Sequence, residues 1–107
     1  MPDTLARLEA TIAARKGADP ATSYVASLFA KGRPRIARKL GEEAVEAIVA
    51  SLAEDKAALT GEAADLLFHL MVLLADAGVR LDDVMAELDR REGVSGHDEK
   101  ASRSVMP

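Results

Sequence analysis

The sequence contains no cysteine and no tryptophan, and aromatic residues make up only 3% of its 107 residues. Without cysteine the chain has no disulfide bond and no thiolate to act as a metal ligand or nucleophile. Alanine and leucine are the most frequent residues instead. This mixture favours helices, because strands are enriched in β-branched and aromatic residues. The composition therefore predicts an all-α protein and is compatible with a reducing cytoplasm.

A targeting segment and a long apolar run are also missing. Residues 1–16 lack the basic start and apolar core of a signal peptide. The most apolar run, residues 66–75, is far shorter than the roughly 20 residues that a membrane helix requires. The formal net charge of −4 argues against general nucleic-acid binding. We therefore expect a cytoplasmic protein that binds neither membranes nor nucleic acid.

Glycines and helix caps divide the chain into helices. Gly17, Gly32 and Gly78 each follow an apolar periodic segment and are expected to end a helix. Ser23 and Asp55 are expected to cap the helices that follow them. The length suits one small domain, spanning residues 1–91, and residues 92–107 form a polar tail that we expect to be mobile without substrate. The five expected helices cover residues 4–16, 24–32, 34–53, 56–77 and 82–91.

Two acidic pairs interrupt the apolar surfaces of the third and fourth expected helices. The third helix carries Glu43 and Glu46, and the fourth carries Glu62 and Asp65. The connection between these helices is short, so they are expected to pack as an antiparallel hairpin. In such a hairpin, the position numbers of two residues that face each other average to the same value, and this value lies in the turn. Glu46 with Glu62, and Glu43 with Asp65, both have their midpoint at position 54, inside the turn. The four carboxylates are therefore expected at one level of two neighbouring helices.

The remaining surface of these two helices is apolar over more than half of its circumference. Helices of this kind are buried on several sides. An isolated chain of this size has too few other residues to cover them. We therefore expect an antiparallel bundle of about five helices whose core is completed by homodimerisation.

Carboxylates that converge inside a helical bundle repel one another and lose their hydration. A divalent cation, basic partners or displacement into solvent would each relieve this cost. Oxygen ligands without cysteine suit a hard cation, Mg²⁺ or alternatively Mn²⁺. Glu42 lies about 100° from Glu43 around the helix, so it is either a surface residue, a neighbour of the ligands or a further ligand. His69 is either a core histidine, a partner of a ligand or a substrate contact.

A basic segment, residues 31–39, precedes the acids and contains no acidic residue. Magnesium in proteins often takes some of its ligands from substrate phosphates, and neighbouring basic residues would bind the remaining phosphate charge. Taken alone, such a segment is more often a solvated loop. Cations at the N-terminal end of a helix are mildly unfavourable for the helix, which indicates another role. The candidate phosphate contacts are Lys31, Arg33, Arg35, Arg38 and Lys39, with Lys39 favoured because it shares the acidic stripe.

Two short motifs resemble a known superfamily. "EEAVE", residues 42–46, followed by "EAAD", residues 62–65, is similar to the EExxE…ExxD pattern of the all-α nucleoside-triphosphate pyrophosphohydrolases, the MazG-like superfamily. The segments "SYVASLFAKG", "RKLGEEAVEAIVA" and "GHDEKASR" narrow the resemblance to the phosphoribosyl-ATP pyrophosphatase family of histidine biosynthesis. The resemblance extends from Leu5 to Arg103, with no departure in the acidic motif.

The resemblance implies hydrolysis of the α–β phosphoanhydride of 1-(5-phosphoribosyl)-ATP, which gives 1-(5-phosphoribosyl)-AMP and pyrophosphate in the second step of histidine biosynthesis. Glu42 would be a further candidate metal ligand, and His69 a candidate substrate contact. Lys100 and Arg103 match the family's "EKASR" ending and are also candidate substrate contacts. By the same resemblance, the Mg²⁺ ligands and catalytic residues would be Glu43, Glu46, Glu62 and Asp65.

Two other functions fit parts of the sequence. A house-cleaning hydrolase of the same superfamily, acting on dUTP, dCTP or non-standard nucleotides, would carry the same acidic motif. A non-catalytic helical adaptor would carry its acids as surface residues paired with Arg38 or Lys39. Hydrolysis of a panel of nucleotides distinguishes the house-cleaning hydrolase from an enzyme that acts on phosphoribosyl-ATP. The effect of Mg²⁺ on the melting temperature distinguishes the adaptor from an enzyme with a specific metal site.

Overall fold

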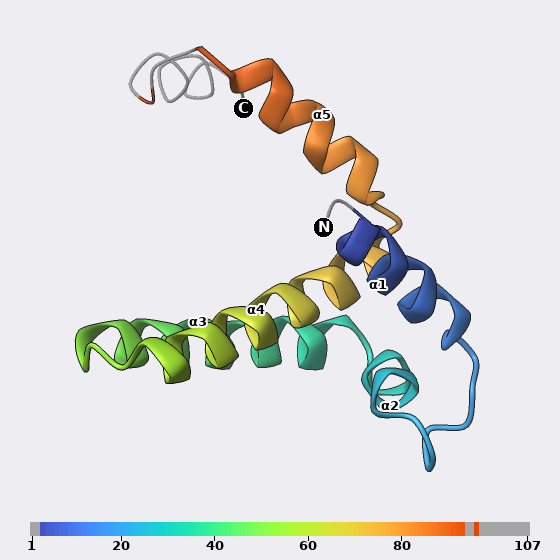
Figure 1. The fold of residues 1–107 in the computed structure, drawn as a ribbon. Coiled ribbons are helices and arrows are strands. Elements are labelled where there is room, and N and C mark those ends of the chain that lie inside the picture. Colours follow the sequence, from blue (N-terminus) through green and yellow to red (C-terminus); the bar gives the residue numbers. More distant parts are fainter. Residues whose placement is uncertain (1–2, 94–95, 97–107) are drawn as a thin grey trace.

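The computed structural model describes residues 3–93 and 96, and the regular structure in this part of the chain is entirely helical (Figure 1). Five helices without a strand among these residues confirm the predicted all-α class. The expected tail lies almost entirely outside the described residues. The helices are α1 (Asp3–Ala14), α2 (Tyr24–Lys31), α3 (Arg33–Leu52), α4 (Lys56–Ala77) and α5 (Leu81–Arg91).

The helix boundaries follow the residues that the sequence selects as caps. Ser23 caps α2, since its hydroxyl oxygen accepts a hydrogen bond from the Ala26 N–H at 3.1 Å. Asp55 caps α4 in the same way, with 3.0 Å between its carboxylate and the Ala58 nitrogen. Gly78 ends α4 in the left-handed conformation, with φ of 74°, which glycine adopts without steric cost. The α4 boundaries are therefore those that the sequence predicts.

Small differences occur where the sequence offers no strong cap. The sequence predicts that α5 begins at Asp82, but it begins at Leu81, with Arg80 in the cap position. The carboxylate of Asp83 accepts a hydrogen bond from the Arg80 N–H at 3.3 Å, and this bond fixes the earlier start. The first helix ends at Ala14 and not at residue 16, because turns follow before Gly17.

Helix α4 lies at the centre of the molecule and contacts α1, α2 and α3. Its Met71 and Val72 meet Ile12 of α1, Leu28 of α2 and Ile36 of α3 in one buried cluster. Burying side chains of this size stabilises the fold by about 1.5–3 kcal/mol each. The apolar core thus fixes the end of the α3–α4 pair that lies near α1 and α2.

Helices α3 and α4 lie side by side along one long arm and are joined by residues 53–55 (Figure 1). At the opposite end of this arm, the guanidinium of Arg33 donates to the Asp76 carboxylate at 2.8 Å and to the Asp76 carbonyl at 3.1 Å. The α3–α4 pair is therefore tied both at its turn and at its far end.

Helix α5 projects away from the α3–α4 arm (Figure 1). Its first backbone N–H, that of Leu81, donates to the carboxylate of Glu9 in α1 at 2.7 Å. The radius of gyration is 16.0 Å, compared with roughly 13 Å for a compact chain of about 100 residues. The single chain is therefore more open than a self-contained domain of its length.

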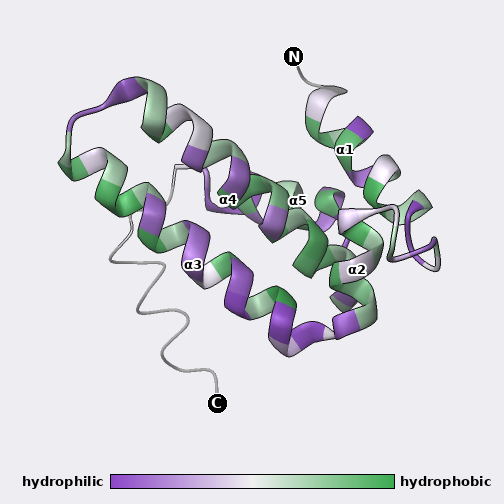
Figure 2. Cartoon of the chain, turned by 90° about the horizontal axis from the view of Figure 1, so that it is seen from below, coloured by the Kyte–Doolittle hydropathy of each residue, from purple (hydrophilic) through white to green (hydrophobic). Residues whose placement is uncertain are grey.

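Apolar side chains remain exposed on several helices. Figure 2 colours all apolar positions of the helices green, the buried ones included. On α3 the exposed apolar residues recur every three or four residues, so they form one stripe on the face opposite the buried residues Ile36, Glu43 and Ala50. The exposed apolar residues of the three later helices are Val45, Ile48, Val49, Leu52, Leu67, Met85 and Leu88.

Helix α4 is also long and apolar enough to span a membrane, judged by length and composition alone. Core helices of soluble proteins pass the same test. In this chain α4 packs against three other helices and carries the acidic residues of the fourth predicted helix. The apolar surface of α4 is therefore interrupted by acidic side chains.

Candidate metal and phosphate site

Three carboxylates from α3 and α4 converge at the middle of the long arm. One carboxylate oxygen from each of Glu43, Glu62 and Asp65 lies within 4.8 Å of the others. Glu43 is buried, with 8% of its surface exposed, whereas Asp65 is exposed. Glu43 is one of only three buried residues of α3, so the helix turns this acid toward α4 with Ile36 and Ala50. The predicted pairing across the hairpin thus brings these three acids together.

Glu46 adjoins this group without being part of the closest set. It is exposed, and its carboxylate shares a hydrogen bond with that of Glu43. This bond, together with burial and the charges of Glu46, Asp65 and Glu62, raises the pKa of Glu43 to about 7. Burial, followed by the charges of Glu46 and Asp65, also raises the pKa of Glu62. Protonation of Glu43 would therefore relieve part of the repulsion in the group.

Two oxygens in the acidic group have no hydrogen-bond partner among the described residues. They are Oε2 of Glu43 and Oε2 of Glu62, and both are inaccessible to solvent. A buried carboxylate oxygen without a donor is costly, and most such oxygens in proteins are paired. A hard cation bound by carboxylates would satisfy both oxygens. The donor set and these two oxygens therefore fit a divalent metal ion.

Glu42 points to different partners from its neighbour Glu43. Its carboxylate lies 3.4 Å from both the Arg38 guanidinium and the Lys39 ammonium. The hydrogen bond from Lys39, helped by the charges of Lys39 and Arg38, lowers the pKa of Glu42. The same bond raises the pKa of Lys39, to which Glu43 and Tyr24 also contribute. Lys39 therefore lies between the acids and α2, and the structure places Glu42 with the basic residues.

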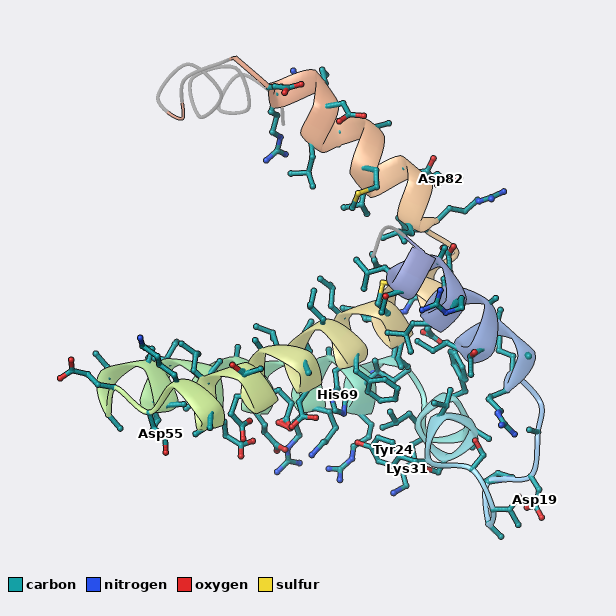
Figure 3. The ribbon with its side chains drawn as sticks, in the orientation of Figure 1. Asp19, Tyr24, Lys31, Asp55, His69 and Asp82 are labelled. Carbon is teal, nitrogen blue, oxygen red and sulfur yellow. The ribbon has the colours of Figure 1, made fainter. Side chains whose placement is uncertain are left out.

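The remaining basic candidates separate into two groups. Arg35 lies near enough to Glu42 to help lower its pKa, and Lys31 is exposed at the end of α2. Arg33 is occupied by its two bonds to Asp76. Figure 3 shows basic side chains continuing from the carboxylates toward Tyr24 and Lys31 along one edge of the molecule. Lys100 and Arg103 lie outside the described residues.

His69 is buried behind this edge, with 5% of its surface exposed. Its Nδ1 lies 2.7 Å from the carbonyl oxygen of Asp65, and its Nε2 lies 2.8 Å from the hydroxyl of Tyr24. Both ring nitrogens are therefore engaged within the protein. The group that separates His69 from solvent is the half-exposed Tyr24 (Figure 3).

A hollow of about 320 Å³ opens beside the acids and is lined by Glu46, Val49, Ala50, Ala58 and Glu62. A second hollow, of about 330 Å³, lies between α1 and the start of α5, away from the acidic group. Among its charged residues, Glu9 and Lys16 bond to backbone groups of the chain itself, and Arg80 pairs with Asp82. The charged residues of this second hollow therefore have partners within the chain.

The sequence model of the phosphoribosyl-ATP pyrophosphohydrolase family matches residues 5–92. This chain belongs to that family. It is 70% identical over 103 residues to the phosphoribosyl-ATP pyrophosphatase of Rhizorhabdus wittichii, covering 96% of this chain and 97% of the relative. The protein of the same name from Erythrobacter litoralis is 63% identical over 101 residues, covering 94% and 97% of the two chains.

A third relative, the phosphoribosyl-ATP pyrophosphatase of Zymomonas mobilis, is 59% identical over 101 residues, covering 94% of both chains. These matches confirm the family that the motifs in the sequence indicate. Membership in the phosphoribosyl-ATP pyrophosphohydrolase family does not by itself assign roles to individual residues, so the metal and substrate residues named above stay predictions.

One residue next to the acidic site was not selected from the sequence. Tyr24 is the only tyrosine of the chain and follows the cap residue Ser23. The sequence places it at the start of a helix but gives no indication that its hydroxyl reaches a histidine 45 positions away. Its position at the site follows from the packing of α2 against α4.

Proposed function

We propose that this chain hydrolyses 1-(5-phosphoribosyl)-ATP to 1-(5-phosphoribosyl)-AMP and pyrophosphate, as a step of histidine biosynthesis. The observation that carries the proposal is the acidic group of Glu43, Glu62 and Asp65, whose buried oxygens lack partners, in a chain that belongs to the phosphoribosyl-ATP pyrophosphohydrolase family. An acidic group of this kind suits a reaction on a phosphoanhydride, because a divalent cation would supply the missing positive partner of the carboxylates and the substrate phosphates would complete its ligand set.

The cation in this proposal is Mg²⁺, with Mn²⁺ as the alternative, held by Glu43, Glu62 and Asp65 with Glu46 beside them. When bound, a divalent cation would neutralise negative charge on the phosphates and on the leaving pyrophosphate. Glu46 and Asp65 are the exposed members of the group, so an attacking water has access to their carboxylates.

The basic residues would orient the phosphates. Lys39 lies next to the acids on the same stripe of α3, and Arg38 and Arg35 lie on the side toward α2. Glu42 holds Arg38 and Lys39 in place while no phosphate is present. We expect that phosphate oxygens compete with Glu42 for these two side chains, because charge-assisted bonds to phosphate are strong.

The working form in this proposal is a homodimer in which a second copy completes the antiparallel bundle. The apolar stripe of α3 faces away from α4. The exposed fraction of its residues ranges from 57% for Ile48 to 78% for Leu52. The open shape of the single chain supports the same arrangement. Interfaces of stable homodimers are rich in apolar residues of this kind.

Sedimentation velocity tests the dimer. The wild-type chain is expected to sediment as a dimer, and Ile48→Glu is expected to shift it toward monomer, because the new carboxylate would be buried without a partner. Glu92→Gln is the control, since it changes one charge on an exposed residue after α5. A monomeric wild-type chain at micromolar concentration would remove dimerisation from the proposal.

The expected location of this enzyme is the cytoplasm.

The activity is tested by pyrophosphate release from phosphoribosyl-ATP, with and without Mg²⁺, with ATP and dUTP as control substrates. Metal-dependent release from phosphoribosyl-ATP alone is the expected result. Release from dUTP or ATP but not from phosphoribosyl-ATP would assign the site to a house-cleaning reaction. A folded protein that releases pyrophosphate from none of them would be left with the adaptor role.

A further inference from the structure

Tyr24 is half-exposed but held in place. Its ring stacks on Phe68, with ring centres 6.1 Å apart and an angle of 21° between the ring planes. The ring of His69 meets it edge-on at 5.8 Å. With 52% of its surface exposed, Tyr24 presents a fixed side chain to solvent at the end of the acidic edge. A fixed and exposed aromatic side chain is well suited to contact a ligand.

The hydrogen bonds of His69 determine the direction of the bond to Tyr24. A backbone carbonyl only accepts hydrogen bonds, so Nδ1 of His69 carries the proton that is donated to Asp65. In the neutral ring, Nε2 is then an acceptor. With the His69 ring neutral, the hydroxyl of Tyr24 is the donor of the 2.8 Å bond to Nε2. Its single hydrogen is used inside the protein.

The Tyr24 oxygen consequently faces outward as an acceptor only. No other hydrogen bond to this oxygen occurs among residues 3–93, so a lone pair is free. Phosphate oxygens and carboxylates are acceptors too and gain nothing from this group. A neutral hydroxyl donor of the ligand is the matching partner. In a nucleotide the hydroxyl donors are those of the ribose, which lie next to the phosphates, whereas the amino group of the base lies farther from them.

The arrangement of charges agrees with this assignment. Along the site the acids come first, Lys39 follows, and Tyr24 is near enough to Lys39 to contribute to its pKa. Phosphates at the acids and Lys39 would leave the sugar at Tyr24. We propose that Tyr24 is a specificity-determining residue that accepts a hydrogen bond from a ribose hydroxyl of the bound nucleotide. This inference rests on the proposed function.

The test compares the wild type with Tyr24→Phe, which keeps the ring and removes only the hydroxyl. Phosphoribosyl-ATP is compared with two analogues, each lacking both the 2- and the 3-hydroxyl of one of its two riboses. For phosphoribosyl-ATP, Tyr24→Phe is expected to raise KM by about 3- to 10-fold and to leave kcat within about twofold, as for the loss of one neutral hydrogen bond. For the analogue that lacks the contacting hydroxyl, KM is expected to be the same in both proteins.

A merely structural role gives a different pattern. If the hydroxyl served only to satisfy His69, Tyr24→Phe would lower the melting temperature and leave the KM ratio between each analogue and phosphoribosyl-ATP unchanged. Phe68→Leu is the matched packing control, because it disturbs the ring stack but keeps the hydroxyl. Binding of Mn²⁺ alone, measured by calorimetry, is expected to be the same in the wild type and Tyr24→Phe, since the hydroxyl is not a ligand.

The outcomes separate the two proposals. Turnover of phosphoribosyl-ATP by the wild type tests the reaction without reference to Tyr24. An unchanged KM in Tyr24→Phe, a loss confined to kcat, or equal losses with phosphoribosyl-ATP and both analogues would each overturn the role of Tyr24 while leaving the reaction in place.

Discussion

Glu43 in α3 and Glu87 in α5 are the same residue type on two amphipathic helices, and their surroundings act on them in opposite directions. Glu43 lies among Glu46, Glu62 and Asp65, and its pKa is raised to about 7. Glu87 accepts hydrogen bonds from Arg90 and Arg91, which lower its pKa to about 2. Ionised Glu87 has its positive partners within its own helix, whereas the α3–α4 acids take up a proton in place of a positive partner.

The comparison separates charges that are paired within the chain from buried polar atoms that are available to a ligand. An ion pair along one helix, such as Glu87 with Arg91, stabilises the folded chain modestly and needs nothing further. The acidic group in α3 and α4 keeps two buried oxygens without partners, which is a cost to the chain alone. Residues retained at such a cost are commonly functional.

The largest effect is expected when the acidic group loses one carboxylate. Glu43→Gln should reduce pyrophosphate release from phosphoribosyl-ATP by at least about 100-fold, because a neutral amide keeps the shape but weakens metal binding. Glu46→Gln should also lose turnover with the fold retained. The measurement is kcat at saturating Mg²⁺, with circular dichroism as the check on folding. The matched control Glu87→Gln should keep kcat within about twofold, and wild-type turnover in Glu43→Gln would remove this residue from the ligand set.

Added metal should stabilise the acidic group and leave the ion pairs of α5 unaffected. At one hundred times its dissociation constant, a ligand that binds only the folded state adds about 2.7 kcal/mol, which corresponds to roughly 10–20 °C in the melting temperature of a small domain. Differential scanning calorimetry with increasing Mg²⁺ or Mn²⁺ measures this shift. Glu62→Gln should lose most of it, and Glu87→Gln should retain it. An equal shift in both variants would point to a metal site elsewhere.

The pH dependence of stability should follow the direction of the Glu43 shift. Its pKa is raised from 4.5 to about 7, so the folded chain holds this proton more tightly than the unfolded chain does. The resulting stability is fully present below about pH 4.5 and is lost as pH rises through about 7. Without metal, the free energy of unfolding should therefore fall by about 1–2 kcal/mol between pH 5 and 8. Urea unfolding at several pH values measures the change, and Glu43→Gln should flatten it.

The smallest effect is expected at Glu87. Its pKa is lowered from 4.5 to about 2, so the stability it contributes is present above about pH 4.5 and is lost as pH falls through about 2. Glu87→Gln should destabilise the folded chain only slightly at pH 7, as is usual for exposed ion pairs. The two proteins should become equally stable near pH 2. A difference that persists there would mean that Glu87 acts through packing and not through charge.

The helices and the levelling of the acids were accessible from the sequence because both depend on local periodicity. Ser23, Asp55 and Gly78 mark helix ends with side-chain or backbone chemistry that acts over a few residues. The shared midpoint of Glu43 and Asp65 needs only a short connection between two straight helices. These features required no knowledge of how α1, α2 and α5 are placed.

The features that the sequence did not yield depend on contacts between distant segments. The bond from Tyr24 to His69 arises only when α2 packs on α4. Arg33 is a candidate phosphate contact in the sequence, yet its side chain bonds to Asp76 near the C-terminal end of α4.

The two bonds from Arg33 to Asp76 mean that α3 and α4 are joined at both ends of their shared length. The turn at residues 53–55 closes one end, and this clamp closes the other, with the acids between them. Two helices joined in this way resist changes in their spacing at the level of the acids. Adaptation to cations of different radius must then come from side-chain rotation, and the exposed carboxylates of Glu46 and Asp65 have the most freedom to rotate.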